Sequence, residues 1–246
     1  MPKDKQIRPR LNERELDRLK EARARNNTGV IADTHAPFTH PAYLEFCSEV
    51  FDKFHCGRIV HIGDEVDNHA ISYHDKDPDG HSAGAEAEAA QAELRRWFDR
   101  FPEVHVCIGN HSELLYRKAK THGIPKKFLK SFPEQWNAPK GWRWEWEWEF
   151  DGVLYQHGTG SSGKSAHEVT ASNNRQSTVI GHVHSHAGIK YLASTKDLIF
   201  GMNVGCGLDI DAYAFAYGKH FAIRPILGCG VVLDGGRVAA FVPMKL

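Results

Sequence analysis

Short apolar runs alternate with longer amphipathic segments over the first half of the chain. Short runs that end in a polar residue are typical of buried strands, and apolar positions about three to four residues apart are typical of helices. We therefore expect strands at 28–33, 58–64 and 103–110, and helices at 41–54 and 83–101. Strands that alternate with helices predict an α/β fold.

The pattern changes to strict alternation at residue 142. The stretch 142–150, WRWEWEWEF, has an aromatic residue at every second position, which predicts one strand with one apolar face. The turn signal Asp151-Gly152 then predicts a hairpin into a strand that ends at His157. Further strands are expected at 177–182, 197–205, 228–234 and 237–243, the last two joined through Gly235-Gly236. We expect these elements to form a single two-sheet β-sandwich flanked by helices.

The segment before the first strand has a different character. Leu11, Leu16 and Leu19 lie near helical spacing among basic residues, which predicts a helix over 11–27 outside the core. No repeat, linker or composition break follows. We expect an N-terminal helical extension, residues 1–27, and one domain, residues 28–246, that carries the chemistry.

Composition excludes few partners but favours a soluble, cytoplasmic protein. The 246 residues include 31 basic and 31 acidic side chains, so the net charge of +0 neither indicates nor excludes nucleic acid. No apolar run approaches the roughly 18 residues of a membrane span, and the N-terminus lacks the apolar region of a secretory signal. The five cysteines are scattered without a C-x-x-C pair, as in reduced intracellular proteins. The 16 histidines are unusual, and they suggest metal binding.

Five polar motifs follow the apolar runs. They are D-T-H (33–35), G-D-E-V-D (63–67), G-N-H (109–111), Q-H-G (156–158) and G-H-V-H (181–184). Ligands of α/β sheets bind beyond the carboxyl ends of the strands, so we expect the five motifs to converge on one crevice.

The side chains of these motifs are oxygen and imidazole donors without sulfur. Such donors suit Mn, Fe, Zn, Co or Ni better than Ca or a structural zinc site. Eight candidates exceed the needs of one tetrahedral ion: Asp33, His35, Asp64, Asn110, His111, His157, His182 and His184. We therefore predict a dinuclear site, in which two ions about 3.5–4 Å apart hold the attacking and leaving oxygens of a phosphoryl displacement.

The motifs, in this order, resemble those of the calcineurin-like metallophosphoesterase superfamily over roughly residues 28 to 205. The resemblance implies a four-layer αββα fold and a dinuclear phosphoesterase in which a metal-bridging hydroxide attacks phosphorus. Mn is the expected ion, with Fe, Zn, Ni and Co as alternatives. Carried over by position, one ion is held by Asp33, His35 and His184, the other by Asn110, His157 and His182, and Asp64 bridges both.

The resemblance also implies roles outside the ligand sets. His111 would be the outer acid that protonates the leaving oxygen or stabilises charge on the phosphate. Asp67 is expected to support a ligand from behind or to shape its loop rather than bind metal. The complete ligand set argues against a binding protein built on an inactive phosphoesterase fold.

Two positions depart from the protein Ser/Thr phosphatases of the superfamily, which carry Arg after G-D-x-V-D and Glu after G-N-H. These positions are Asn68 and Ser112 here. Because Arg grips a terminal phosphate through two hydrogen bonds, its loss favours a phosphodiester in DNA, RNA or a nucleotide. A phosphomonoesterase acting on a nucleotide or small molecule remains an alternative. The loss of the carboxylate at Ser112 means that another group must orient His111.

The stretch Gly158–Ser165 fits the phosphate-binding loop G-x-x-x-x-G-K-[ST]. One alternative is therefore a P-loop nucleotide-binding protein, with Asp234 at the end of a later strand as the magnesium ligand. Another hypothesis is an anion-binding rim beside the metals, in which Lys164 contacts phosphate; a plain Gly/Ser surface loop is equally compatible. We also predict substrate contacts for Asn68 and His69, and substrate specificity in the loops 68–82, 112–141 and 206–226.

Overall fold

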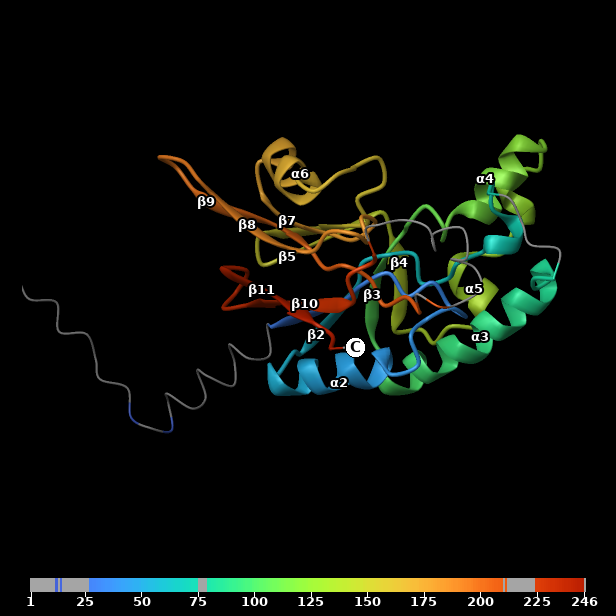
Figure 1. Cartoon of the computed structure of the whole chain (residues 1–246), viewed down its shortest axis with the longest axis horizontal. Helices are drawn as coiled ribbons and strands as arrows, with labels where there is room; N and C mark the ends of the chain where they lie inside the picture. The colour runs from blue at the N-terminus through green and yellow to red at the C-terminus, as the bar shows by residue number, and fades with distance from the viewer. Residues whose placement is uncertain are drawn as a thin grey trace, which may run out of the picture.

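The computed structural model describes residues 12, 14, 27–74, 79–209, 211 and 224–245. Its strands form two mixed sheets that lie face to face (Figure 1). The six-stranded sheet has the order β11 (Val238–Pro243), β10 (Gly228–Leu233), β1 (Thr28–Ile31), β2 (Arg58–His61), β3 (Val104–Cys107) and β4 (Trp142–Glu145). The five-stranded sheet has the order β5 (Glu147–Phe150), β6 (Val153–Gln156), β7 (Ser177–Ile180), β9 (Leu198–Asn203) and β8 (Gly188–Ala193).

Both sheets contain a block of parallel strands, with antiparallel strands at one margin of the six-stranded sheet and at both margins of the five-stranded sheet. β1, β2, β3 and β4 are parallel, and the hairpin of β10 and β11 joins them antiparallel to β1. β6, β7 and β9 are parallel, with β5 and β8 antiparallel at the two edges. Parallel strands end at the same edge of a sheet, so the loops after these strands gather there.

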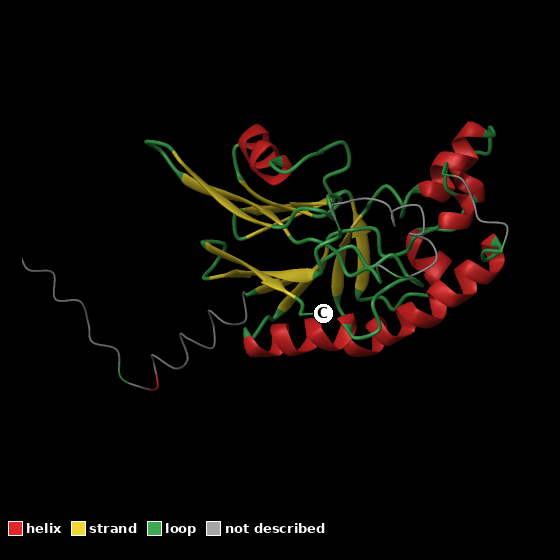
Figure 2. Cartoon of the chain, viewed as in Figure 1, coloured by secondary structure: helices red, strands yellow, loops and turns green. Residues whose placement is uncertain are grey.

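Helices cover both outer faces of the pair of sheets (Figure 2). α2 (Tyr43–Lys53) and α3 (Ala83–Arg100) run along the six-stranded sheet, and α6 (Ala166–Asn174) packs on β7 and β9 of the five-stranded sheet. The predicted two-sheet sandwich with αββα layers is therefore confirmed. A group of short helices lies beyond one end of the sheets: η1 (His69–Ile71), α4 (Leu114–Thr121), η2 (Lys126–Phe128) and α5 (Phe132–Trp136).

Large side chains fill the layers between these elements. Tyr43 of α2 is fully buried, and its hydroxyl donates to the carbonyl of Gly228 at 2.7 Å while it accepts from the Ala32 amide at 3.0 Å. The indole of Trp148 in one sheet donates to the Val106 carbonyl of the other at 3.0 Å. Burial of each such side chain contributes about 1.5–3 kcal/mol, so the core holds the two sheets together.

The alternating stretch 142–150 forms two strands, not the single strand that we predicted. β4 pairs with β3, β5 pairs with β6 of the other sheet, and Trp146 between them is 60% exposed. A period-two pattern indicates which face of a strand is buried but contains no information on its partner. The chain crosses from one sheet to the other at Trp146, while Trp142 and Trp148 both face the interior.

Other differences concern elements without a clear period. The edge strand β8 was not predicted, because all six of its residues are half-buried or exposed and its apolar positions do not alternate cleanly. Nor were the short helices between residues 114 and 136 predicted. The helix expected over 11–27 lies outside the described residues, apart from positions 12, 14 and 27, and the division at residue 27 remains a prediction.

Two further findings concern membrane-spanning helices and the cysteines. None of the helices described is both long enough and apolar enough to cross a bilayer. All five cysteines are free thiols, as their spacing predicts.

Candidate metal centre

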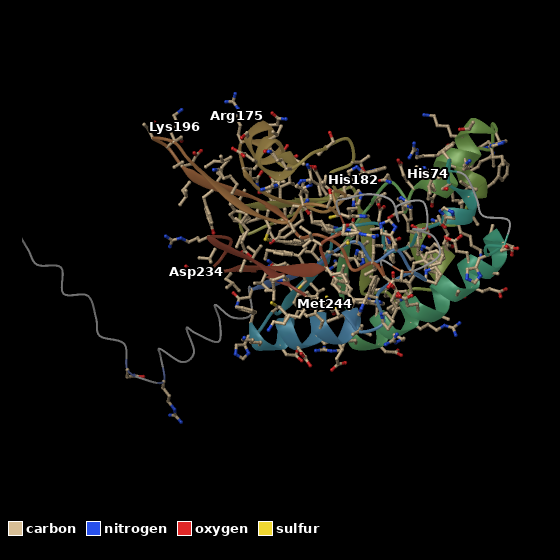
Figure 3. All side chains as sticks on the ribbon, viewed as in Figure 1. His74, Arg175, His182, Lys196, Asp234 and Met244 are labelled. Carbon is tan, nitrogen blue, oxygen red and sulfur yellow. The ribbon has the colours of Figure 1, made fainter. Side chains whose placement is uncertain are left out.

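The five polar motifs lie where parallel strands end. Three follow β1, β2 and β3 of one sheet, and two follow β6 and β7 of the other, so the motifs meet at a common edge that includes His182 (Figure 3). Two clusters of possible ligands have atoms within 4.8 Å of one another and contain all the predicted ligands except Asn110. They are Asp33, His35 and His184, and Asp64, His157 and His182.

Asp33 is fully buried at the centre of the first cluster. Its Oδ2 accepts from the main-chain amide of His182 at 2.8 Å and lies 2.9 Å from Nε2 of His184. Its Oδ1 has no hydrogen-bond partner among the described residues. Burial raises the pKa of Asp33, but nearby His157 and His184 lower it by a larger amount, so the net pKa is below the ordinary value. A buried, ionised carboxylate with an unsatisfied oxygen is suited to a cation.

His35 presents a defined nitrogen to this cluster. Its Nδ1 lies 2.7 Å from the carboxylate of Asp67, so Nδ1 carries the proton and Nε2 is the nitrogen that could serve as a metal ligand. Nε2 lies 4.0 Å from Oδ2 of Asp64. His35, Asp67 and His111 form a third cluster with possible metal ligands, but Asp67 Oδ1 is engaged by His35. This geometry agrees with the first of the two roles predicted for Asp67, a carboxylate that supports a ligand from behind.

His157 is the centre of the second cluster. Its Nδ1 donates to the carbonyl of Ile62 at 3.1 Å, and its Nε2 lies 3.0 Å from both Asp64 Oδ2 and Asn110 Oδ1. Burial lowers the pKa of His157, but Asp64 and Asp33 more than offset this and raise it to about 9. In the absence of metal, Nε2 of His157 therefore carries a proton, which lies where the possible metal-ligand atoms converge.

Asp64 lies between the two clusters. Its Oδ1 accepts from the amides of His111 at 2.7 Å and Ser112 at 3.3 Å. Its Oδ2 faces His157 at 3.0 Å and His35 at 4.0 Å, so one oxygen is anchored and the other is directed toward both clusters. An oxygen placed in this way could be shared between two ions.

His111 is oriented by the main chain rather than by the residue after it. The Nδ1 of His111 donates to the carbonyl of Asp67 at 2.5 Å. The main-chain carbonyl of His111 accepts from Nδ2 of Asn68 at 2.9 Å. Burial lowers the pKa of His111, but Asp64 and Asp67 raise it by more, so the net pKa is above the ordinary value. The loop after β2 therefore supplies the orienting group that the sequence lacks at Ser112.

The backbone of the site is strained. His35, Asp64, Asn68 and His182 have φ between +49° and +65°, a region that few residues other than glycine adopt. Such conformations persist where the surrounding structure requires a particular side-chain placement, and they concentrate at functional sites.

Two glycines of the motifs allow the carboxylates to approach the backbone. A Cβ on Gly109 would lie 2.1 Å from Oδ1 of Asp64, and one on Gly181 would lie 2.2 Å from Oδ1 of Asp33. Both distances are far below van der Waals contact, so any larger residue would displace a predicted ligand.

Glu65 has a structural role that the sequence analysis did not assign. It is fully buried and accepts from Ser112 Oγ at 2.6 Å and from the indole of Trp144 at 3.1 Å. Burial raises its pKa, which the hydrogen bonds from Ser112 and Trp144 only partly counteract. Its place inside the G-D-E-V-D motif was the available signal, but its partners lie 47 and 79 residues away.

The predicted substrate contacts are less well defined. Asn68 uses its amide to brace His111, and His69 lies 3.9 Å from Oδ2 of Asp67 with its side chain 12% exposed. Lys164 is exposed in the loop before α6. Its contact with phosphate remains a prediction.

The P-loop alternative does not fit the topology. β6, which precedes Gly158, lies in the five-stranded sheet, whereas Asp234 follows β10 in the other sheet and sits in a tight turn with φ of +51°. Figure 3 shows Asp234 at the far end of the sheets from His182. A P-loop needs its magnesium-binding Asp near the phosphates, so this pair of segments cannot form one.

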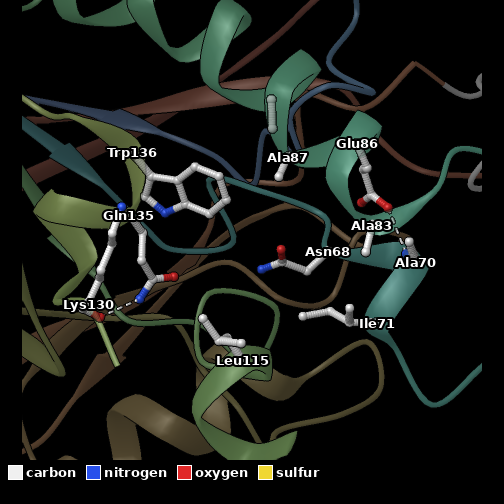
Figure 4. Close-up of a pocket in the computed structure, with 11 residues that line it drawn as sticks. Asn68, Ala70, Ile71, Ala83, Glu86, Ala87, Leu115, Lys130, Gln135 and Trp136 are labelled. Carbon is white, nitrogen blue, oxygen red and sulfur yellow. Dashed lines mark hydrogen bonds between the residues drawn. The ribbon is translucent and has the colours of Figure 1, made fainter. Parts of the chain in front are cut away.

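A cavity of about 290 Å³ is lined in part by Asn68, whose side-chain amide contacts the His111 carbonyl (Figure 4). Its walls are mainly apolar and come from η1, α3, α4 and the segment around α5, including Ile71, Leu115 and Trp136. These segments overlap two of the three loops predicted to determine specificity, 68–82 and 112–141.

Comparisons with known proteins find only distant likenesses. No family model and no curated protein matches the sequence. Similar solved structures include vacuolar protein sorting 29 from Cryptosporidium parvum (14% identity, 90% of this chain and 98% of that chain covered, TM-score 0.41) and nuclease MPE from Pseudomonas putida (16%, 90% and 88%, 0.38). Another is YfcE, a phosphoesterase from E. coli (14%, 89% and 100%, 0.37). At these identities and TM-scores, no activity follows from the likeness.

The resemblance to calcineurin-like metallophosphoesterases nevertheless extends beyond the motifs. The chain has the two-sheet fold with flanking helices that the resemblance implies. It also brings the predicted His and Asp side chains into clusters that could hold divalent metal ions.

Proposed function

We propose that this chain is a calcineurin-like metallophosphoesterase that hydrolyses phosphodiester bonds with the aid of two divalent transition-metal ions, Mn being the expected one. The observation that supports this most directly is the position of Asp64. One of its oxygens is fixed by two main-chain amides and the other faces both ligand clusters.

The donor set fits two metal ions. Asp33, His35 and His184 would hold one, and Asn110, His157 and His182 the other, with Asp64 shared. The unsatisfied Oδ1 of Asp33 and the raised pKa of His157 both indicate a site built to compensate negative charge. Bound ions would neutralise charge on the phosphoryl oxygens and make water acidic enough to act as a nucleophile at neutral pH.

His111 is the proposed general acid. Because its Nδ1 is engaged by the Asp67 carbonyl, Nε2 is the atom that can transfer a proton to the leaving oxygen. Its raised pKa favours the protonated form that this step requires. The mainly apolar cavity is lined in part by Asn68, which contacts the His111 carbonyl, and it is the candidate place for the organic part of a leaving group.

The residues around His111 favour a diester over a terminal phosphate. Asn68 stands where the monoesterase branch has Arg, and its amide is already bound to the His111 carbonyl. It cannot form the paired, charge-assisted hydrogen bonds by which a guanidinium grips a dianionic phosphate. A diester carries one charge fewer and depends less on that contact.

The test compares bis(4-nitrophenyl) phosphate with 4-nitrophenyl phosphate, each with added Mn²⁺ and with EDTA. We expect Mn²⁺-dependent turnover of the diester that is lost in Asp64→Asn and retained in Asp99→Asn, a matched change at an exposed position of α3. Turnover of the monoester alone would favour the phosphomonoesterase alternative. Absence of bound metal by elemental analysis after loading would contradict the proposal as a whole.

A further inference from the structure

One described segment carries a marked excess of positive charge in a chain whose net charge is +0. Residues 113–130, here called the basic arm, comprise α4, η2 and the turn between them. Glu113 is their only acidic residue, and it pairs with Arg117 at 3.7 Å. The six basic residues are Arg117, Lys118, Lys120, Lys126, Lys127 and Lys130.

The basic arm starts at the metal centre. The amide of Glu113 donates to the Gly109 carbonyl at 3.1 Å, and that of Leu114 donates to the His111 carbonyl at 3.2 Å. From there α4 extends away from the sheets, over about 12 Å for eight residues (Figure 1). A polyanion bound along the arm would therefore have part of its length at the metal ligands.

Three of the five lysines of the arm lie beside aromatic rings. Within the described part of the chain, none of them has a carboxylate within 4.0 Å. Lys118 Nζ lies 3.9 Å above the ring of Tyr73, and Lys127 Nζ lies 5.1 Å from the ring of Phe128. These cation–π contacts orient the ammonium groups but leave their charge uncompensated.

Apolar side chains are exposed on the arm and beside it. On the arm, Phe128 is 70% exposed and Ile124 is 47% exposed, and Tyr73, which contacts Lys118 of the arm, is 56% exposed. Exposed rings interleaved with uncompensated cations match the chemistry of proteins that bind single-stranded nucleic acids, in which cations contact phosphates and bases stack on aromatic side chains.

We propose that the basic arm binds the phosphate backbone of single-stranded DNA or RNA, with Phe128 stacked on a base, and leads the strand to the metal centre. Cleavage of that strand rests on the proposed phosphodiesterase function, whereas binding does not. The arm thus identifies the substrate class as a nucleic acid rather than a free nucleotide.

Binding is tested by fluorescence anisotropy with fluorescein-labelled oligo(dT) and oligo(U) of about 16 nucleotides, in EDTA to prevent cleavage. The test variant is Lys126→Glu/Lys127→Glu. The matched control is Lys190→Glu/Lys196→Glu on β8 and the turn after it, and Figure 3 shows Lys196 at the opposite end of the molecule from His74.

We expect the arm variant to bind roughly tenfold or more weakly, and its affinity to fall less steeply with salt, by about 0.7 in log–log slope per lost phosphate contact. Phe128→Ala should also weaken binding roughly tenfold, with little change in salt slope. The control should bind as the wild type does. The ratio of oligo(dT) to oligo(U) affinity then assigns the natural strand to DNA or RNA.

The same samples are assayed with bis(4-nitrophenyl) phosphate, which is too small to span the arm. Unchanged turnover in the arm variants, with weaker oligonucleotide binding, would support the proposal. Wild-type affinity in Lys126→Glu/Lys127→Glu, an equal loss in the control, or tighter binding to phosphatidylserine vesicles than to oligonucleotides would each overturn it. Lack of diester turnover in the wild type would count against the phosphodiesterase function alone.

Discussion

The main-chain carbonyl of Asp67 holds the imidazole of His111, with 2.5 Å between the oxygen and Nδ1. A carbonyl can only accept, so the tautomer of His111 is determined without a carboxylate at the next position. The side chain of Asp67 meanwhile orients His35 at 2.7 Å. One residue thus positions both a proposed metal ligand and the proposed acid.

His111→Gln should lower kcat on phosphodiesters by about 100- to 10,000-fold, because the leaving oxygen loses its proton donor. Metal content should be unchanged, since His111 belongs to neither of the two proposed ligand sets. The deficit should be larger for methyl than for 4-nitrophenyl leaving groups, because a basic alkoxide depends more on protonation. Steady-state kinetics over such a series tests this, with His122→Gln as an exposed control; a uniform deficit would contradict the acid role.

Metal affinity should increase with pH. The pKa of His157 in the metal-free protein is raised to about 9, and an ion can bind its Nε2 only after the proton leaves. Below that pH the ion competes with a proton, so affinity should rise by up to about tenfold per unit and level off above it.

Calorimetry of Mn²⁺ binding at neutral pH in buffers of different ionisation enthalpy measures the proton that is released. The release should diminish in His157→Gln and be unchanged in His81→Gln, a change at an exposed histidine. An affinity for Mn²⁺ that did not depend on pH would show that the metal does not displace a proton from His157.

Gly181→Ala should impair metal binding and also lower the stability of the fold. The added Cβ would lie 2.2 Å from Oδ1 of Asp33 and 2.5 Å from Cγ2 of buried Ile62, so the carboxylate must move away from the first cluster and the core must adjust. Gly84→Ala is the matched control, since a Cβ there meets nothing within 4 Å and Ala is the better helix former. Metal content and Tm distinguish the two effects; a fully loaded Gly181→Ala would mean that Asp33 is not required in its observed position.

Ser112→Asp, which restores an acidic residue at this position, should destabilise the protein more than Ser112→Ala. Loss of the hydroxyl removes a 2.6 Å hydrogen bond to buried Glu65, at a cost of about 1–3 kcal/mol. A second carboxylate in the same buried space adds charge repulsion to that loss.

Urea unfolding at neutral pH measures both changes, with Ser162→Asp at an exposed position as control. Glu65→Gln should rescue much of the Ser112→Asp defect, because it removes one of the two charges. If Ser112→Asp were as stable as the wild type, the buried network around Glu65 would have no role in selecting serine.

The convergence of the motifs was predictable because each follows a recognisable apolar run, and parallel strands end at one edge. Asp33 and His157 could therefore be placed together although they come from different sheets. Two sets of contacts could not be predicted: those of Glu65 with Ser112 and Trp144, and that of His111 with the Asp67 carbonyl. Both join segments that are distant in sequence. The crossing from one sheet to the other at Trp146 was not predicted for a related reason. An alternation of apolar and polar residues indicates which face of a strand is buried, but not which strand pairs with it.

The ligand clusters draw on both sheets. Asp33 follows the first described strand, and His184, whose Nε2 lies 2.9 Å from it, is 151 residues further along the chain. An ion held by both would close a loop of that length, which is the kind of constraint a long-range disulfide imposes on an unfolded chain. Metal binding would then stabilise the whole sandwich against unfolding, and chelation would lower the stability of regions far from any scissile phosphate.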